Sequence, residues 1–252
     1  MRAFLLSLSV LGACGRKPPA PLPIQNPTPA AEASDYAQGL ADAMFPLPSE
    51  VSDNLIALVP EQAGLQWSDD GRLLVYTWSR SQFYSADYVP GYDFDLYGET
   101  WLTTATEVAD ACAGMEGDDL SLRVEQLLGL PEGGGRDVFL KLWIDPAVLF
   151  RPCADPDTAT TTCPIASPLE ATDDGGVYWS CGDGPHQQWL CETWTERYGA
   201  SDTGSRYPWT ALGYTYDWGN LDDPVGASEF VAPAGTPVTL EAIVDNETFC
   251  AE

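Results

Sequence analysis

The chain has 252 residues, of which 44% are hydrophobic, so it has enough apolar material for one domain with a substantial core. Acidic residues outnumber basic residues by 38 to 11, which gives a formal net charge of −27. This charge repels nucleic acid and anionic lipid headgroups, so it disfavours nucleic-acid binding, whereas cations and basic partners are compatible with it. Solubility in a salty medium would explain the same charge.

The first fourteen residues have the parts of an export signal. A short basic start, Met1-Arg2, precedes residues 3–10, which are apolar apart from two serines, and Leu11-Gly12-Ala13-Cys14 follows. This order is typical of a secretory signal, and the apolar run is too short to span a bilayer as a helix. The Leu-Gly-Ala-Cys tetrapeptide resembles the lipobox of bacterial lipoproteins.

The resemblance to a lipobox implies that residues 1–13 are removed and that Cys14 carries the lipid. Gly15 is not acidic, and in this family such a residue implies delivery to the outer membrane. The alternative is an ordinary signal peptide whose cysteine is incidental. Residues 14–34 contain six prolines among small residues, which favours an extended tether without a core. Residues 35–252 are then expected to form a single globular domain.

Six cysteines follow Cys14, and an even number in an exported chain predicts three disulfides. Loop closure is easiest for near neighbours, which favours two local pairs and leaves the two most distant cysteines to each other. The preferred pairs are Cys153–Cys163, Cys181–Cys191 and Cys112–Cys250. Other pairings stay open. A zinc site is the rival interpretation, but the chain has no Cys-x-x-Cys and one histidine, so no metal centre is predicted.

The first half of the predicted domain contains short elements. Residues 34–45 form a helix in which apolar side chains recur every four positions. Residues 55–59 form an apolar strand. An Asp-Gly turn between the apolar runs at 65–67 and 73–78 predicts a hairpin.

The middle of the chain has clearer signals. A capping box at 104–107 starts a helix that should end near residue 113. A second helix is predicted over 118–129 from its leucine and valine stripe and its terminal glycine. Residues 137–144 are apolar on nearly both faces, which predicts a central strand covered on both sides, and 145–151 begin with a helical turn.

The last part of the chain combines a loop, a helix and strands. A long loop at 153–176 is followed by a helix at 183–197, and strands at 230–231 and 238–244 close the domain. No repeat occurs at a fixed period. Strands dominate and helices are interspersed irregularly, so the predicted class is α+β: a mainly antiparallel or mixed sheet with about four helices in one disulfide-stapled domain.

The densest run of aromatic residues lies at 207–220. From Leu212 to Trp218, apolar or aromatic residues alternate with small or polar ones, which predicts a strand with one aromatic face. Aromatic faces can stack on sugar rings, while a nearby carboxylate accepts hydrogen bonds from the hydroxyl groups of the sugar. The candidate ligand-binding residues are therefore Trp209, Tyr214, Tyr216, Asp217 and Trp218. The alternative is core packing, since a large aromatic side chain buries about 150–250 Å².

Motifs for catalysis are absent from the sequence. There is no Gly-x-Ser-x-Gly or His-Glu-x-x-His, and the single histidine, His186, is expected to be a surface or packing residue. Asp93 and Asp95 share one face of an alternating strand, with Glu99 nearby. Such carboxylates can act in glycoside cleavage or bind calcium, although a solvated strand face gives the same pattern. The acidic loop 217–223 also suits calcium, or is simply a turn rich in Asp and Asn.

Two further segments, at 142–153 and 207–220, resemble segments of bacterial exported proteins of unknown function. The resemblance implies that the protein is exported, but it implies no catalytic or binding activity. Within the first segment, Arg151 is one of few basic residues, and we expect it to pair with a carboxylate and anchor its loop to the core.

The sequence therefore favours a lipid-anchored protein of the bacterial cell envelope, held at the outer membrane by Cys14, with a binding or structural role. Its partner would be an envelope glycan or protein, and calcium is the only cofactor considered. An enzyme is disfavoured because no catalytic motif is present. The alternative function is a carboxylate-dependent hydrolase that acts on polysaccharide or glycan through Asp93, Asp95 or Asp217.

Overall fold

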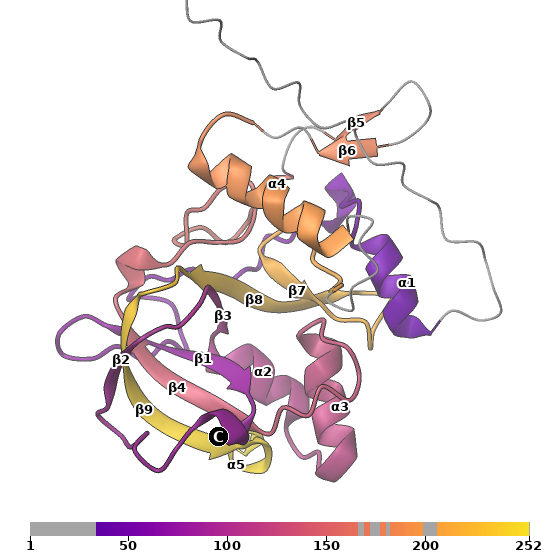
Figure 1. Ribbon diagram of the computed structural model, residues 1–252. Coiled ribbons are helices and arrows are strands. Elements are labelled where there is room, and N and C mark those ends of the chain that lie inside the picture. Colours follow the sequence, from indigo (N-terminus) through magenta and orange to yellow (C-terminus); the bar gives the residue numbers. More distant parts are fainter. Residues whose placement is uncertain (1–33, 166–168, 172–176, 180–181, 199–205, 252) are drawn as a thin grey trace, which may run out of the picture.

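A computed structural model shows a seven-stranded antiparallel sheet in the order β2-β9-β4-β1-β3-β8-β7 (Figure 1). It describes residues 34–165, 169–171, 177–179, 182–198 and 206–251. The strands of the sheet are β1 (Leu73–Ser79), β2 (Asp93–Asp95), β3 (Thr100–Thr103), β4 (Val138–Ile144), β7 (Tyr214–Tyr216), β8 (Val225–Ala232) and β9 (Pro237–Asp245). A separate hairpin pairs β5 (Leu169–Ala171) with β6 (Val177–Trp179).

Five α-helices accompany this sheet in the described part of the chain, so the predicted α+β class is confirmed. The α-helices are α1 (Asp35–Asp42), α2 (Ala105–Cys112), α3 (Gly117–Leu127), α4 (Pro185–Tyr198) and α5 (Asn246–Cys250). Single 3-10 turns occur at η1 (Pro48–Glu50), η2 (Ser81–Phe83) and η3 (Pro146–Val148). Helices α2, α3 and α5 pack against one face of the sheet, whereas α4 lies beyond β8 and β7 (Figure 1). Among the described residues, no helix has both the length and the apolar character needed to cross a bilayer.

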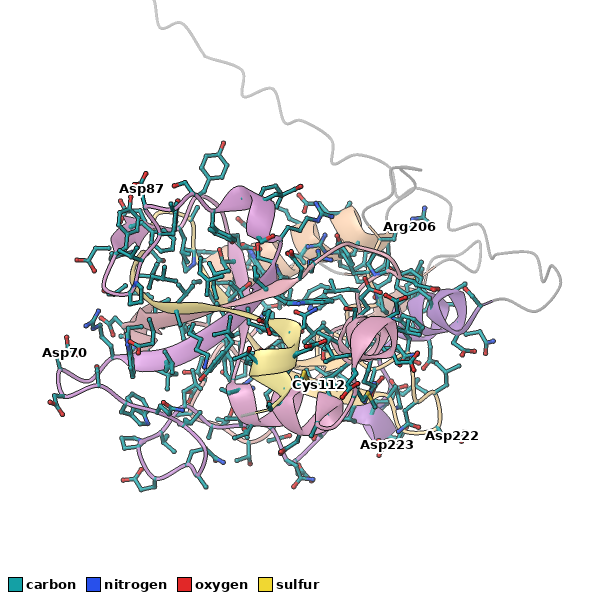
Figure 2. The ribbon with its side chains drawn as sticks, turned by 90° about the horizontal axis from the view of Figure 1, so that it is seen from below. Asp70, Asp87, Cys112, Arg206, Asp222 and Asp223 are labelled. Carbon is teal, nitrogen blue, oxygen red and sulfur yellow. A yellow bond between two sulfur atoms is a disulfide. The ribbon has the colours of Figure 1, made fainter. Side chains whose placement is uncertain are left out.

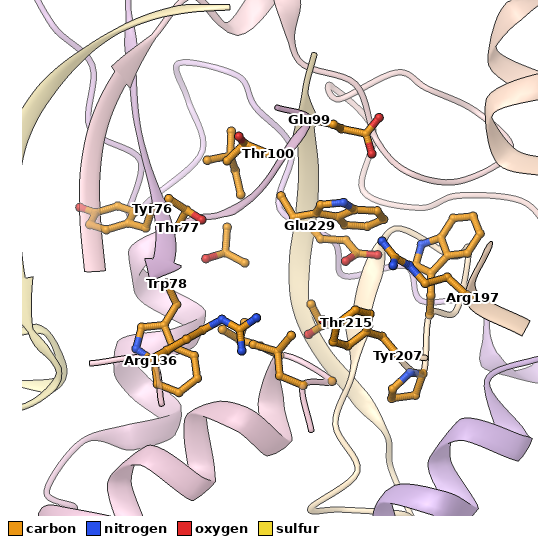
Figure 3. A pocket seen from close by; sticks show the side chains of 18 residues that line it. Tyr76, Thr77, Trp78, Glu99, Thr100, Arg136, Arg197, Tyr207, Thr215 and Glu229 are labelled. Carbon is orange, nitrogen blue, oxygen red and sulfur yellow. The ribbon is translucent and has the colours of Figure 1, made fainter. Parts of the chain in front are cut away.

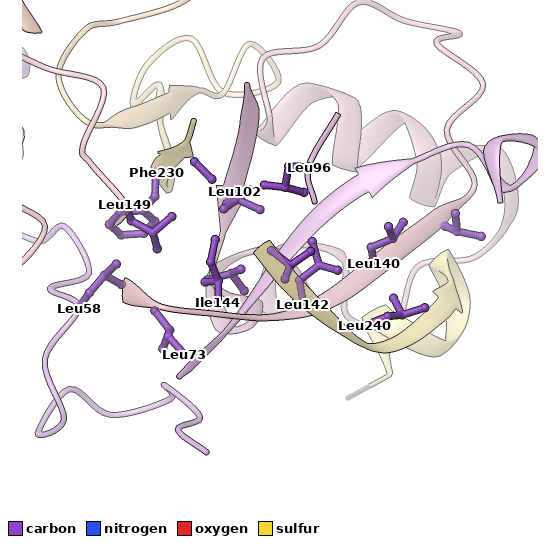
Figure 4. Packing of buried hydrophobic residues seen from close by; sticks show 14 residues of the cluster. Leu58, Leu73, Leu96, Leu102, Leu140, Leu142, Ile144, Leu149, Phe230 and Leu240 are labelled. Atoms are coloured by element: carbon purple, nitrogen blue, oxygen red, sulfur yellow. The ribbon is translucent and has the colours of Figure 1, made fainter. Parts of the chain in front are cut away.

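Strand β4 is the doubly covered central strand that the sequence predicts. It lies between β9 and β1. Leu140 and Leu142 point into a core cluster on one face, which Figure 4 shows, whereas Phe139 points into the cluster beneath α2, α3 and α5 on the other. Neighbouring β1 alternates in the same way, with Val75 in the first cluster and Leu74 in the second. The period-two pattern of these strands therefore fixes two separate layers of core.

Residues 55–59 are not the predicted strand. Leu55 and Leu58 are buried, but their N–H groups donate to the carbonyls of Thr161 and Thr158 in an irregular loop. The predicted loop at 153–176 also contains β5. Strand β3 and helix α5 were not predicted, because both are short and lack a periodic pattern of their own.

Arg151 anchors its loop as predicted, but it does so through carbonyl groups. Its side chain is fully buried, and Nη2 donates to the carbonyls of Ile56 at 2.8 Å and Thr160 at 2.9 Å. The guanidinium also lies 4.9 Å from the centre of the Phe230 ring. No ion pair forms at Arg151 within the described part of the chain, so the expected carboxylate partner was wrong. Because the Ile56 carbonyl accepts from Arg151, it is not free to pair with a neighbouring strand, which helps to keep residues 55–59 irregular.

The predicted disulfides Cys112–Cys250 and Cys153–Cys163 are present. The first disulfide joins the end of α2 to the end of α5, within the layer of helices on one face of the sheet (Figure 2). The second closes the loop around Arg151. Cys191 on α4 is disulfide-bonded as well, and its predicted partner Cys181 lies outside the described residues.

Candidate functional site: an aromatic cleft around Glu229

The aromatic residues predicted to bind a ligand are buried in the core. Their exposed fractions lie between 2% and 6%, for Trp209, Tyr214, Tyr216, Asp217 and Trp218. The polar tips are also satisfied inside the protein: the hydroxyl of Tyr214 donates to the Glu50 carbonyl at 2.7 Å, and that of Tyr216 donates to Asp42 at 2.8 Å. The strand itself is shorter than predicted, because Ala211 and Gly213 have positive φ angles. These residues therefore form no open stacking face, and only Trp209 borders a cleft.

The aspartates proposed for hydrolysis or calcium binding do not form a site. Both carboxylate oxygens of Asp217 accept from Arg123 at 2.7 Å, in a forked ion pair. Asp93 and Asp95 are exposed on edge strand β2. Asp222 points outward at the periphery of the molecule (Figure 2). The aspartate-based hydrolase is therefore not supported by this geometry, and neither is a calcium site that requires Asp217.

His186 is a packing residue, as expected. Its Nε2 lies 2.7 Å from the carbonyl oxygen of Cys153, and its ring stacks on Trp189 at 5.8 Å between centroids. Among the described residues, no side chain that could act as a nucleophile or base forms a hydrogen bond with His186.

A cleft of about 510 Å³ opens beside the sheet, where β1, β3 and β8 meet the loop after α3, the end of α4 and residues 207–209 (Figure 3). The register places Tyr76 opposite Thr103, and Thr103 opposite Glu229, in a row across the three strands. Residues opposite each other in a sheet point to the same face. Side chains from three strands therefore reach the cleft together. Aromatic walls are supplied by Trp78, Trp101, Tyr207 and Trp209.

Glu229 is the buried acid of this cleft. Its side chain shares a face with Ala227, whereas Phe230 next to it points into the core cluster on the opposite face. The residue is 5% exposed, and its Oε1 has no hydrogen-bond partner among the described residues. Burial raises the pKa of Glu229 to about 8, although Arg197, Arg151 and the nearby indole N–H of Trp209 all act to lower it. At neutral pH the carboxyl group is therefore mainly protonated.

Two arginines face each other across the cleft. Arg197, in the last turn of α4, lies 5.0 Å from the centre of the Tyr207 ring and 5.9 Å from that of Trp101. Arg136 lies 6.0 Å from the centre of a ring of Trp78. Within the described part of the chain, neither guanidinium takes part in a hydrogen bond or an ion pair. Both cations are held against aromatic faces and are available to an anion.

The loop that carries Arg136 is fixed by a second buried acid. The carboxylate of Glu125, on α3, accepts from the N–H groups of Gly133 at 2.9 Å and Gly134 at 2.7 Å. Chain reversal here uses positive φ angles at Gly133 and Gly135, which glycine adopts without strain. The turn brings Arg136 to the cleft.

Glu99 is a further carboxylate at the cleft. It is exposed and accepts from Trp189 Nε1 at 2.6 Å, and Trp189 packs on Trp101 at 6.1 Å between centroids. Figure 3 shows Glu99 and Glu229 on the same side of the cleft. Asp93 and Asp95 do not line the cleft, so Glu99 is the one member of this predicted acidic group that does.

Sequence reasoning did not identify Glu229, Arg197 or Arg136. The available signal for Glu229 is an acid inside the apolar run Ala-Ser-Glu-Phe-Val-Ala, where a charged residue is costly unless it has a purpose. The arginines carry no such signal, because their proximity arises from the fold. Comparisons of the chain with family models, curated proteins and solved structures find no match.

Proposed function

We propose that this protein is a lipid-anchored cell-envelope protein whose folded domain binds a small ligand in the Glu229 cleft. The observation that carries the proposal is the incompletely hydrogen-bonded carboxyl group of Glu229, buried at the side of an aromatic cleft. Buried polar groups are normally paired, and exceptions in a cavity tend to mark functional sites. The ligand would supply the missing partner.

The dimensions and lining of the cleft support a binding role. Its volume of about 510 Å³ falls within the range that small-molecule sites occupy. The walls are largely aromatic, and the few polar groups, Glu229, Arg197 and Arg136, converge on one space, which is the usual composition of such sites. Membrane attachment rests on the lipobox at Cys14 and on the proline-rich tether after it.

Tryptophan fluorescence tests the binding role, because three tryptophans line the cleft. We would titrate the purified protein with soluble oligosaccharides from envelope and secreted polysaccharides. A ligand should change the emission of the wild type, and Trp101→Ala should weaken its binding about tenfold through loss of the aromatic wall. Trp143→Ala is the matched control, since that indole donates to Glu241 away from the cleft. A response unchanged by Trp101→Ala would contradict the proposal.

One observation favours a second function, carboxylate-dependent hydrolysis with Glu229 in place of the aspartates. A protonated acid with a pKa near neutrality suits proton donation to a glycosidic oxygen, and Glu99 on the same cleft would be the second carboxylate. The titration distinguishes the two functions. A binding protein leaves the oligosaccharide intact, whereas a hydrolase shortens it and Glu229→Gln stops the shortening.

A further inference from the structure

We propose that the cleft recognises a sugar ring that carries a carboxylate, as a uronic acid does, with the ring against the aromatic walls and the carboxylate between Arg197 and Glu229. This inference rests on the proposed function and names the chemical class of its ligand. It follows from three features of the cleft: its unpaired cations, its buried acid and its rings.

The cations argue for an anionic ligand. The chain has only 11 basic residues against 38 acidic ones. Among the described arginines, two form ion pairs with carboxylates. Arg123 pairs with Asp217 and Arg72 pairs with Asp70. Arg136 and Arg197 line the cleft without an anion in the described structure. An arginine fork matches the two oxygens of a carboxylate, which makes a carboxylated ligand a fitting partner.

Glu229 would oppose an anion if it were ionised, but its surroundings keep it protonated. Arg197 from α4 and Arg151 from the loop after η3 are the positive groups near it, and no ion pair joins either one to Glu229 among the described residues. Tyr198 of α4 and Tyr214 of β7 also face it, and burial raises the pKa of both, so they stay neutral. A protonated carboxyl group has an O–H to donate, and a ligand carboxylate can accept it.

The rings argue that the anion is attached to a sugar. Trp101 and Tyr207 flank Arg197 directly, so a ligand carboxylate at this arginine places its own ring against them. Aromatic faces cover the apolar face of a sugar ring. Thr77 and Thr100 line the other side of the cleft, where ring hydroxyls need hydrogen-bond partners (Figure 3).

The experiment compares galacturonic acid trimer with the neutral galactose trimer, by calorimetry on the purified protein at pH 6.5. We expect the acidic trimer to bind at least about tenfold more tightly, because a bidentate charge-assisted contact is worth more than 1.4 kcal/mol. Arg197→Met should remove this preference, so that the acidic trimer binds no more tightly than the neutral one. Arg72→Met, on the surface, is the matched control.

A pH series separates direct recognition by Glu229 from a structural role. Affinity of the wild type for the acidic trimer should fall as pH rises through about 8, because ionised Glu229 repels the ligand. Glu229→Gln keeps a donor and cannot ionise, so its affinity should stay level from pH 6 to 9. Circular dichroism would verify that each variant is folded.

Several results would overturn the inference. These are equal binding of the two trimers, no binding of the acidic trimer, preference for a phosphorylated sugar, or an Arg197→Met variant that binds like the wild type. The proposed function has its own test in the wider oligosaccharide titration with Trp101→Ala. A cleft that binds another ligand there would disprove the uronic-acid inference and leave the binding role intact.

Discussion

Glu229 links the chemistry of the cleft to the stability of the fold. Its pKa is about 8 in the folded protein, against an ordinary value of 4.5. Between these two values the folded state holds a proton that the unfolded chain has released. Stability therefore decreases as pH rises through this window, and the whole penalty is present above pH 8. Below about pH 4.5 both states are protonated, and Glu229 has no effect.

We accordingly expect Glu229→Gln to be more stable than the wild type at pH 9 by several kcal/mol, and about equally stable at pH 5. Urea unfolding at pH 5, 7 and 9 measures the difference. Burial also raises the pKa of Glu107, but that residue is common to both proteins and cancels in the comparison. A difference that does not vary with pH would show that Glu229 is ionised in the folded state.

Single residues were the hardest feature to predict from the sequence. Local patterns drew attention to Asp217, which the fold uses in an ion pair with Arg123 from a distant helix. The same patterns gave no weight to Glu229, because its pKa depends on burial and on Arg197, Arg151 and Trp209, which the fold brings to it. Burial and charge partners are properties of the folded arrangement, so a linear pattern of acids does not reveal which one is functional.

At the scale of elements, the strongest local signals were reliable. The apolar pattern of β4 and the stripe and terminal glycine of α3 predicted both elements within about two residues. The helix at 105–112 also begins where the capping box places it. Glu107 there accepts from the backbone N–H and the hydroxyl of Ser228 at 2.9 Å, and from the Thr104 hydroxyl at 3.5 Å. The aromatic strand was overextended, since alternation in sequence does not reveal a positive φ such as that of Ala211.

The disulfide Cys112–Cys250 yields a prediction at this scale. It joins residues 138 positions apart, whereas Cys153–Cys163 spans 10. In the chain-entropy model the longer loop contributes about 5 kcal/mol and the shorter one about 3 kcal/mol, because closing a longer loop removes more freedom from the unfolded chain. Replacing Cys112 and Cys250 by alanine should therefore lower the unfolding free energy more than replacing the other pair. Urea denaturation of both double variants measures this, and the reverse order would contradict it.

The molecule as a whole has a strongly acidic periphery. Carboxylates such as Asp70, Asp87 and Asp223 project from it (Figure 2), and Arg136 and Arg197 line the cleft. The whole chain has a formal net charge of −27, so it is repelled by anionic lipid surfaces. A surface of this kind provides no electrostatic attraction to a membrane. The proposed attachment to the envelope therefore depends on the N-terminal segment.

The lipid on Cys14 is the proposed source of that attachment, and its test is the last prediction. A single acyl chain binds a membrane only marginally, whereas two or more give stable anchoring that can overcome charge repulsion. Expressed in a bacterium with two membranes, the wild type should sediment with the outer membrane and carry the mass of acyl groups on Cys14. The variant Cys14→Ser should lose both properties. Gly15→Asp is the matched control, because it should keep the lipid and change the membrane to which the protein sediments.

The anchoring experiment also distinguishes the lipobox from an ordinary signal peptide. An ordinary signal would release a soluble mature chain, with Cys14 either removed or present as an unmodified thiol. That result would leave the cleft and its proposed ligand in place but would detach them from the membrane. A lipidated wild type, in contrast, would place the cleft at the end of a proline-rich tether, where it could reach polysaccharide beyond the lipid headgroups.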